Sequence, residues 1–571
     1  MTLVEKTAGS TVFEAELCFP RLLDDAHLSD CGLFYYHYNV DGNIILGGES
    51  PTELEVLDGY DGERQLLLCS PEYDTSHSFR DGIVYHIFVD RFCRSGKSPV
   101  KSYAVLDENW DGGCPPFAEH PGDAIDNCTF FGGDLWGVVE KLDYIASLGT
   151  KTIYLSPVFD AHTNHKYDTG DYTKIDTMFG GDAALAELCK AARERDIDVI
   201  LDGVFNHTGD DSVYFNRRGR YPTLGAYQSK ESPFYDWYKF REYPDSYECW
   251  WGVDILPRVD STNEGYRSFI CDGVVDKWMK TGVAGWRLDV VDEISDVFLD
   301  DLRRAVKKHN PDGVIIGEVW EDATDKVSYG ERRHYLSGGQ LDSVMNYPLR
   351  SGVISYIRDG DCDILRRATE TLYRRYPKQS SDNLLNFLGT HDTERIITVL
   401  GGEAAGEKTN AELAAAKMTA DEKSAAVGKL KLAYSLICGL PGVPCVFYGD
   451  EVGLEGYRDP FCRRPFPWND MNGDLLAHYR KLGNIRKTHA VFRDGLFRLR
   501  KLTPEHVIYE RLPWSMGDEK IVVAVVREGT LTVRFSDDVT ELIGGKSGSE
   551  FTLSAGESGY FACGAGTEMI L

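Results

Sequence analysis

Short apolar runs alternate with amphipathic windows along most of the chain, from about residue 82 onward. The windows repeat apolar residues at helical spacing; in one of them Leu135, Val138 and Leu142 form a stripe, and Asp134 is placed to cap its start. Eight runs are rich in β-branched residues and apolar on both faces, as parallel strands inside a barrel require. They are Ile83–Asp90, Thr152–Phe159, Asp198–Phe205, Gly285–Val290, Gly313–Trp320, Ser343–Leu349, Asn383–Leu388 and Cys445–Tyr448. Eight strand–helix units in a row predict an α/β fold, a closed (β/α)8 TIM barrel.

Four segments depart from this alternation. Residues 208–263 follow the third run and are rich in Tyr, Trp and Pro, which predicts an inserted subdomain over the barrel mouth. A second insertion, residues 401–429, is expected to add helical turns. Residues 1–80 and 492–571 contain short strand-like runs separated by turn residues, so we expect a β-sandwich module at each end. These boundaries leave residues 81–491 for the barrel domain.

The charge balance narrows the kinds of partner. The chain has 62 Lys and Arg residues against 91 Asp and Glu residues, a formal net charge of −29, so a nucleic-acid partner is not expected. It has no stretch of about 20 apolar residues, so no membrane span is expected. The N-terminus lacks the pattern of a signal peptide, and the 14 cysteines are scattered without a CxxC pair, which predicts reduced thiols and a cytoplasmic protein.

Polar side chains gather where the predicted strands end. The third, fourth, fifth and seventh runs end in or near Asp202, Asn206, His207, Arg287, Asp289, Glu318, His391 and Asp392. In an eight-stranded barrel these ends meet at one rim, which is where catalytic groups are found. A single carboxylate at a strand end is more often a helix cap or an ion-pair partner. That explanation does not suit so many of them together.

Two of these carboxylates suit glycosidic bond cleavage. Asp289 and Glu318 end adjacent strands, which lie about 4.8 Å apart, and a retaining glycosidase needs two carboxyl groups about 5–5.5 Å apart. Arg287 lies two residues before Asp289 on the same side of the strand, and a nearby cation favours the ionised carboxylate. We therefore expect Asp289 to be the nucleophile and Glu318 the acid and base.

The strand ends resemble the sequence blocks of the α-amylase superfamily, glycoside hydrolase family 13. The blocks in this chain are DGVFNH, GWRLDV, GEVW and THD, in the family's order, and the resemblance covers about residues 82–490. It implies that Asp392 stabilises the transition state. It also implies that His207, Arg287 and His391 hold the sugar at the cleavage subsite, while Asp202 and Asn206 have supporting roles.

Further stretches are similar to the neopullulanase, cyclomaltodextrinase and maltogenic amylase branch. Residues 164–172 read NHKYDTGDY, where that branch has NHKYDTADY, and residues 391–395 and 459–465 are also close to it. The resemblance implies that Tyr167 stacks on the sugar ring and that Asp459 and Arg463 contact the non-reducing end of the substrate. Trp320 would stack on the acceptor side, although a structural tryptophan is the alternative there.

The chain also departs from the family. After the first strand, where relatives have a calcium loop, Arg94 and Lys97 replace oxygen ligands. The sequence therefore predicts no required cofactor and no metal ligand, and it leaves a structural calcium ion as an open alternative. Residues 290–293 read VVDE where relatives often have VANE, so their linkage preference is not carried over.

Other aromatic and histidine residues allow a non-catalytic explanation. His86, in the first run, is expected to be a core histidine rather than a ligand. Trp250 and Trp251 fit a sugar-binding platform or the core of the inserted subdomain equally well.

The function expected from residues and resemblance together is a retaining α-glucan hydrolase. It would cleave α-1,4-glucosidic bonds of maltodextrins, cyclodextrins or pullulan, and α-1,6 cleavage is left open. One alternative is an α-glucan transferase or a sucrose-isomerising enzyme of the same superfamily. Another is a non-catalytic glucan-binding protein, which the three retained carboxylates argue against. The expected partner is an α-glucan, and a homodimer is left open.

Overall fold

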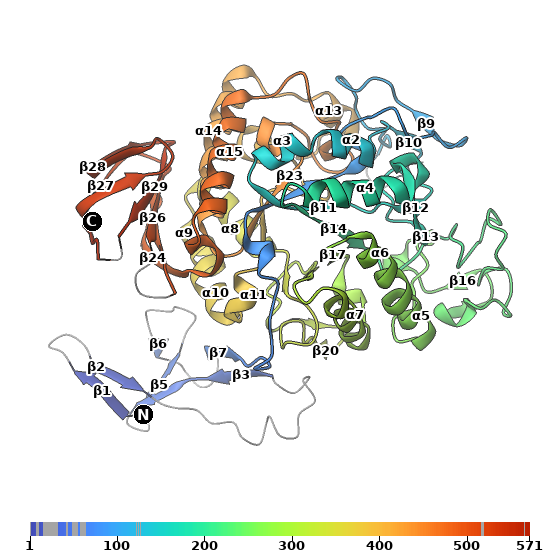
Figure 1. The fold of residues 1–571 in the computed structure, drawn as a ribbon, viewed down its shortest axis with the longest axis horizontal. Coiled ribbons are helices and arrows are strands. Elements are labelled where there is room, and N and C mark those ends of the chain that lie inside the picture. The colour runs from blue at the N-terminus through green and yellow to red at the C-terminus, as the bar shows by residue number, and fades with distance from the viewer. Residues whose placement is uncertain are drawn as a thin grey trace.

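Eight parallel strands form a barrel at the centre of the molecule (Figure 1). The computed structural model describes residues 2–6, 11–14, 32–40, 44–47, 55–56, 64–120, 123, 125, 127–514, 519–564 and 566–570. The barrel strands in chain order are β8 (Ile83–Ile87), β11 (Thr150–Leu155), β14 (Asp198–Gly203), β17 (Gly285–Leu288), β18 (Val314–Gly317), β21 (Ser343–Val344), β22 (Leu385–Phe387) and β23 (Val443–Phe447). A parallel bridge between Met345 and Leu385 closes the ring between β21 and β22.

Each barrel strand overlaps one of the eight predicted runs, although β11 and β23 each begin two residues before theirs, and the (β/α)8 prediction is confirmed. Most strands end before their run does, because the last residues of the run leave the sheet and form the rim. Alternate side chains of a strand face opposite sides. Val84 and Tyr154 belong to an apolar cluster inside the barrel, while Tyr85 and Ile153 belong to the larger cluster beneath the helices. Both faces are therefore apolar, as the pattern predicted.

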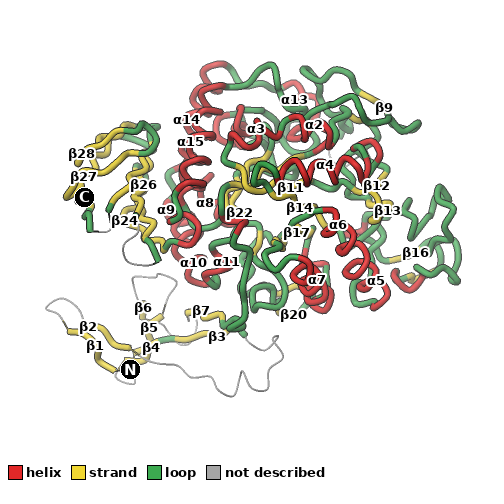
Figure 2. The backbone as a smooth tube through the Cα atoms, in the orientation of Figure 1, coloured by secondary structure: helices red, strands yellow, loops and turns green. Residues whose placement is uncertain are grey.

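Helices cover the outside of the barrel (Figures 1 and 2). The longer ones are α4 (Gly181–Arg193), α7 (Asp296–His309), α8 (Tyr347–Asp359), α14 (Ala420–Gly439) and α15 (Gly473–Thr488); shorter ones include α2 (Leu135–Glu140), α3 (Leu142–Ser147), α5 (Glu264–Ser268), α6 (Asp276–Thr281) and α12 (Ile396–Gly401). The Asp134 carboxylate accepts a hydrogen bond of 2.7 Å from the amide of Gly137, so the predicted cap of the first helix is confirmed. None of the helices in the described ranges is long and apolar enough to cross a membrane.

The first of the two predicted insertions has little regular structure, whereas the second adds helical turns as expected. Residues 208–263 contain the hairpin strands β15 (Phe240–Glu242) and β16 (Ser246–Tyr247), and their aromatic core includes Tyr214, Phe215 and Trp237. The second insertion, residues 401–429, contains α13 (Asn410–Ala415) and the first half of α14. Both insertions lie in loops at the carboxyl-terminal side of the barrel, so they help to shape the rim.

Antiparallel strands occupy both ends of the chain. The C-terminal sheet contains β24 (Leu496–Leu502), β25 (His506–Leu512), β26 (Lys520–Val526), β27 (Thr530–Glu541), β28 (Lys546–Ser554), β29 (Ser558–Cys563) and β30 (Met569–Ile570). Val523 packs with the helices of the barrel, whereas Val522 belongs to a separate apolar core formed by the sheet itself.

Near the N-terminus, the described strands form three small sheets. β1 (Thr2–Lys6) pairs with β2 (Thr11–Glu14), β3 (Leu33–Tyr36) pairs with β7 (Arg64–Leu67), and β4 (Tyr38–Val40), β5 (Ile44–Gly47) and β6 (Glu55–Val56) form the third. Part of the sandwich predicted for residues 1–80 lies outside the described residues, so that prediction stays untested.

Two buried carboxyl groups lie just after the last barrel strand. Asp450 pairs with Arg395 at 3.0 Å, and burial raises the pKa of Asp450 to about 6. Glu451 accepts hydrogen bonds from Tyr85 at 2.6 Å and Tyr144 at 2.7 Å. Burial is the largest effect on Glu451 and raises its pKa from 4.5 to about 7. The folded protein therefore keeps the carboxyl group of Glu451 protonated at a pH where the unfolded chain has lost that proton.

Replacing Glu451 by Gln should remove one source of pH-dependent stability. The wild-type contribution is fully present below about pH 4.5 and is lost as the pH rises through about 7, because only the folded state then still binds the proton. We expect Glu451→Gln to gain stability over the wild type between pH 5 and pH 8, on the order of 1–3 kcal/mol. Urea unfolding at both pH values measures this gain. A control is Glu187→Gln on the exposed face of α4, and parallel pH profiles for wild type and Glu451→Gln would contradict the expectation.

Candidate active site

The polar side chains predicted for the site leave the barrel at its carboxyl-terminal rim. Asp202 and Arg287 lie in the neighbouring strands β14 and β17 and are paired in register. Asp289 directly follows β17, and Glu318 directly follows β18. His391 and Asp392 follow β22 after a short loop. The fold thus brings residues that are far apart in sequence to one end of the barrel.

One guanidinium group joins three carboxylates at the centre of the site. The fully buried Arg287 lies 2.9 Å from Asp202 and 3.1 Å from Asp289 through Nη1, and 2.7 Å from Glu318 through Nη2. Burial alone would lower the pKa of Arg287, but the carboxylates of Asp202 and Glu318 raise it well above its ordinary value. The cation is therefore permanent, and its charge is shared by more acidic groups than it can neutralise.

Burial and this sharing of Arg287 together set the protonation state of Asp289. Asn206 donates to Asp289 Oδ2 at 3.1 Å, and Arg287 donates to Oδ1. Burial raises the pKa of Asp289 well above its ordinary value; Arg287 opposes this, while the charges of Glu318 and Asp202 add to it. We expected Arg287 to keep Asp289 ionised. The cation does act in that direction, but burial and the neighbouring carboxylates outweigh it.

Glu318 is held by donors from three directions. The amide of Val290 donates to Oε2 at 3.0 Å, while the indole of Trp320 and the hydroxyl of Tyr347 lie 3.1 and 3.3 Å from Oε1. The ring of Trp320 stacks on Tyr347 at 4.2 Å, yet Trp320 remains 52% exposed. An indole buried for purely structural reasons would not be so exposed, so Trp320 can also offer a face to a ligand.

A second cation lies beside Asp392. Arg463 Nη2 is 3.2 Å from Asp392 Oδ1, and Nη1 of the same side chain is 3.0 Å from Asp459. His391 Nε2 lies 3.0 Å from Asp392 Oδ2. Burial would raise the pKa of Asp392, but His391 and Arg463 together bring it well below its ordinary value. The Asp392 side chain is still 36% exposed, so an ionised carboxylate faces the open end of the site.

Tyr167 connects the two charged groups. Its hydroxyl lies 2.5 Å from His391 Nε2 and 3.0 Å from Asp202, and its ring is stacked with that of His391. Its carbonyl oxygen is 3.0 Å from Nε2 of His207, whose pKa burial lowers to about 4. All ten residues predicted for catalysis or substrate binding thus lie in one continuous network of contacts, which runs through Asp202.

The remaining sequence candidates lie beside that network, and the ring of His86 is 5.5 Å from that of His391. His86 is buried, stacks on Tyr154 at 4.1 Å and lies 2.9 Å from the hydroxyl of Ser156, as a core histidine does. The rings of Trp250 and Trp251 are stacked 4.9 Å apart, and Trp251 is 72% exposed. The pair is therefore not the core of the insertion; it forms an aromatic surface near His207, whose ring is 5.7 Å from that of Trp250.

Two residues beside the site carry little signal in the sequence. Tyr347 lies within an apolar run, and Glu293 stands in a block that differs from the family's. Glu293 Oε1 accepts hydrogen bonds from Trp251 at 3.0 Å and from Tyr329 at 2.5 Å. Trp251 and Tyr329 both have left-handed backbones, with φ of 45° and 52°, and Tyr329 is 68% exposed. One carboxylate thus holds two exposed aromatic rings from different loops.

Comparisons with known proteins agree with this geometry. A model of the α-amylase catalytic domain matches residues 86–481. Amylopullulanase from Thermoanaerobacterium saccharolyticum is 35% identical over 517 residues, which cover 81% of this chain and 39% of that protein. Neopullulanase 2 from Thermoactinomyces vulgaris is 32% identical over 468 residues, which cover 78% of this chain and 70% of that protein. The structure of a cyclic α-maltosyl-(1→6)-maltose hydrolase from Arthrobacter globiformis has a TM-score of 0.70 at 28% identity and covers 86% of this chain and 100% of that chain.

The fold and site define an α/β-barrel protein of the glycosidase type, and the chain belongs to the α-amylase catalytic-domain family. The resemblance to the neopullulanase branch is confirmed. The chain spans between about a quarter and two fifths of the length of the amylopullulanases that it matches.

Proposed function

We propose that this protein is a retaining α-glucan hydrolase that cleaves α-1,4-glucosidic bonds. The observation that carries the proposal is the pair Asp289 and Glu318, joined by one guanidinium at the end of adjacent strands, with the exposed carboxylate of Asp392 in the same network. Membership of the α-amylase family supports it. Two carboxyl groups on one side of a sugar ring, with a third that meets developing positive charge, match the needs of this reaction.

In the proposed mechanism Asp289 attacks the anomeric carbon while Glu318 gives its proton to the departing glycosidic oxygen. The covalent glycosyl ester is then released when Glu318 takes a proton from water and the water oxygen displaces Asp289. The reactive state therefore needs one proton on the pair, located on Glu318. Hydrogen bonds from Arg287 and Asn206 to Asp289 stabilise the ionised nucleophile in that state, and ionised Asp392 stabilises the oxocarbenium-like transition state.

The surroundings suggest how a glucan chain is oriented. We assign Asp459 and Arg463 to the non-reducing end, because they lie on one side of Asp392, and Trp320 to the acceptor side, because its exposed ring adjoins the proton donor. Tyr167, His207 and His391 would contact the sugar at the point of cleavage. Aromatic faces provide apolar contact to sugar rings, so the exposed Trp251 and Tyr329 extend the acceptor side.

The same surroundings favour some transfer to sugar acceptors. The ester formed on Asp289 reacts with whichever hydroxyl reaches it, and three exposed aromatic rings beside Glu318 and Glu293 can hold a sugar there.

We also propose activity on α-1,6 bonds, since relatives named neopullulanase and amylopullulanase lie among the matches. A cytoplasmic location is proposed because the twelve cysteines that the structure describes are free thiols.

Replacing Asp289 by Asn should remove the nucleophile and leave the site intact. We expect at least a 1,000-fold loss of kcat on maltoheptaose, with substrate binding largely kept, because an amide cannot form the glycosyl ester. Initial rates measure the loss of kcat, and calorimetric titration measures substrate binding.

In the wild type, NMR of freshly formed products should show the α-anomer first, because a retaining enzyme keeps the configuration of the anomeric carbon. A β-anomer formed first, or activity that survives in Asp289→Asn, would contradict the mechanism.

Replacing Asp202 by Asn should extend activity to lower pH. Asp289 must be ionised to attack, so kcat/KM falls as the pH drops through its raised pKa. The charge of Asp202 contributes to that raised pKa and also takes part of the Arg287 charge. Its removal should therefore shift the acidic limb of the kcat/KM profile toward lower pH. Asp198→Asn, at the start of the same strand, is the control, and a shift toward higher pH would refute the assignment.

A further inference from the structure

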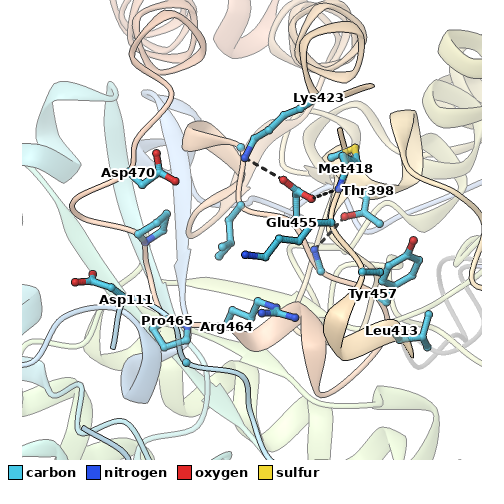
Figure 3. A pocket seen from close by; sticks show the side chains of 18 of the residues that line it. Asp111, Thr398, Leu413, Met418, Lys423, Glu455, Tyr457, Arg464, Pro465 and Asp470 are labelled. Carbon is cyan, nitrogen blue, oxygen red and sulfur yellow. Dashed lines mark hydrogen bonds and ion pairs between the residues drawn. The ribbon is translucent and has the colours of Figure 1, made fainter. Parts of the chain in front are cut away.

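A cavity of about 520 Å³ is lined by none of the ten predicted site residues (Figure 3). Its walls come from three segments: residues 110–113 in the loop between β9 (Val105–Leu106) and β10 (Thr129–Phe130), residues 398–423 around α13, and residues 453–470 after β23. The volume lies in the range of small-molecule sites, about 300–1,000 Å³. Arg464 in its wall directly follows Arg463 of the active site.

Hydrogen bonds between these segments form the cavity before any ligand binds. The Asn410 side chain at the start of α13 donates to the carbonyl of Ala118 at 2.8 Å, and Arg464 donates to the carbonyl of Ala414 at 2.6 Å. Glu455 accepts from the amide of Met418 at 2.9 Å. The insertion is thus fastened to the barrel on several sides of the opening, so a ligand would meet walls that are already ordered.

The lining favours a neutral ligand rich in hydroxyl groups. Carboxylates outnumber cations, which disfavours an anion, and both donors and acceptors are present for hydroxyls. The charged lining residues are Asp111, Glu403, Glu422, Glu455, Asp470, Lys417, Lys423 and Arg464. Apolar surface for the faces of sugar rings comes from Trp110, Leu413, Met418, Tyr457 and Pro465. In Figure 3 Glu455 and its ion-pair partner Lys423 lie across the cavity from Asp111 and Pro465.

We propose that this cavity is a second α-glucan-binding site, which holds a short segment of a glucan chain outside the catalytic cleft. The inference rests on the proposed function for its ligand class. It goes beyond that function because no catalytic group faces the cavity. A chain held here would stay close to the cleft by way of the Arg463–Arg464 segment, which raises its effective concentration there.

Calorimetric titration of the Asp289→Asn variant with maltotriose tests the second site. We expect two binding sites per chain. Replacing the ion pair together, as Lys423→Met with Glu455→Leu, should weaken one site at least tenfold and leave the other unchanged. The matched control replaces the exposed pair Lys190–Glu187 on α4 in the same way. Ala416→Trp, which fills the cavity without touching the ion pair, should also abolish the second site.

A single site in Asp289→Asn, or two sites that neither cavity variant affects, would overturn the inference. Thermal unfolding shows whether each variant is folded. The proposed function is tested separately, and it fails if the wild type hydrolyses no α-glucan. If two maltotriose sites are still found in that case, the inference of a second binding site is retained.

A different observation concerns the loop after β8, where the family resemblance implies calcium. The Arg94 side chain donates to the carbonyl oxygens of Phe131 and Asp107, each at 2.8 Å. Its guanidinium also lies over the ring of Trp110, 5.6 Å from the centroid. Carbonyl oxygens are typical calcium ligands. Here an arginine on the same loop already uses them.

The carboxylates of this loop are also engaged by donors. Asp90 accepts from Arg91 at 2.6 Å and from the amides of Phe131 and Gly132 at 3.0 Å. Asp134 accepts from Ser95, Ser98 and the amide of Gly137 at 2.6–2.7 Å. In the ranges that the structure describes, no three His, Cys, Asp or Glu residues are grouped so that they could hold a metal ion. The residues present therefore do not fit calcium.

We infer that Arg94 is an internal cation that cross-links this loop in place of a metal ion. The charge that holds Asp107 and Phe131 together is covalently part of the chain, so it cannot be removed by a chelator. Removing the guanidinium of Arg94 should then destabilise the loop, and adding or removing calcium should leave its stability unchanged.

Thermal unfolding with and without EDTA or added calcium tests this inference. The wild-type Tm should not change under either condition. Arg94→Met should lower Tm by several degrees, because the carbonyl groups of Phe131 and Asp107 lose this donor, and calcium should not restore it. Lys97→Met, which removes an exposed cation of the same loop, is the control and should change Tm little. A wild-type Tm that falls with EDTA and rises with calcium, or an unchanged Tm in Arg94→Met, would overturn it.

Discussion

The geometry of the active site depends on one buried cation shared by three carboxylates. Arg287 reaches Asp202, Asp289 and Glu318, and each of these acids would be costly to bury ionised without it. Because the four residues belong to three adjacent strands, the charge also fixes the rim of the barrel at that point. Catalytic geometry and fold stability are therefore coupled through a single side chain, and neither can be changed alone there.

The two sides of the site show how burial and neighbouring groups together set the pKa of a carboxyl group. Asp289 is buried and shares Arg287 with two other carboxylates, and its pKa is raised. Asp392 has His391 and Arg463 beside it, and its pKa is lowered although burial acts on it in the opposite direction. The site thus contains one acid that readily holds a proton and one that does not. Because Asp289 attacks only when it is ionised, the proton of the pair must lie on Glu318 in the proposed reactive state, while ionised Asp392 faces the developing positive charge.

Sequence patterns predicted the barrel and the charged cluster at its rim because both follow simple rules, whereas Tyr167, Trp320, Asp459 and Arg463 were predicted from the family resemblance alone. Apolar runs of strand length mark the barrel, and charged residues at their ends can meet only at one rim. Tyr347 could not be found this way, since an aromatic residue in an apolar run carries no chemical signal. Nor could the raised pKa of Asp289, which depends on its burial and on how many acids share Arg287. The contact of Trp251 and Tyr329 with Glu293 depends on loop conformations that no periodicity reveals.

The closure of the barrel has a consequence for heat resistance. The ring closes between its shortest strands, β21 and β22, through the bridge at Met345 and two hydrogen bonds from Asn346, one from its amide to the carbonyl of Leu385 and one from its side chain to Asn386. Because β21 and β22 pair over few residues, separating these two strands needs the least free energy of any neighbouring pair in the barrel. The next residue, Tyr347, is a hydrogen-bond partner of Glu318. Warming should therefore loosen the proton donor first, so that turnover is lost while most of the wall is still intact.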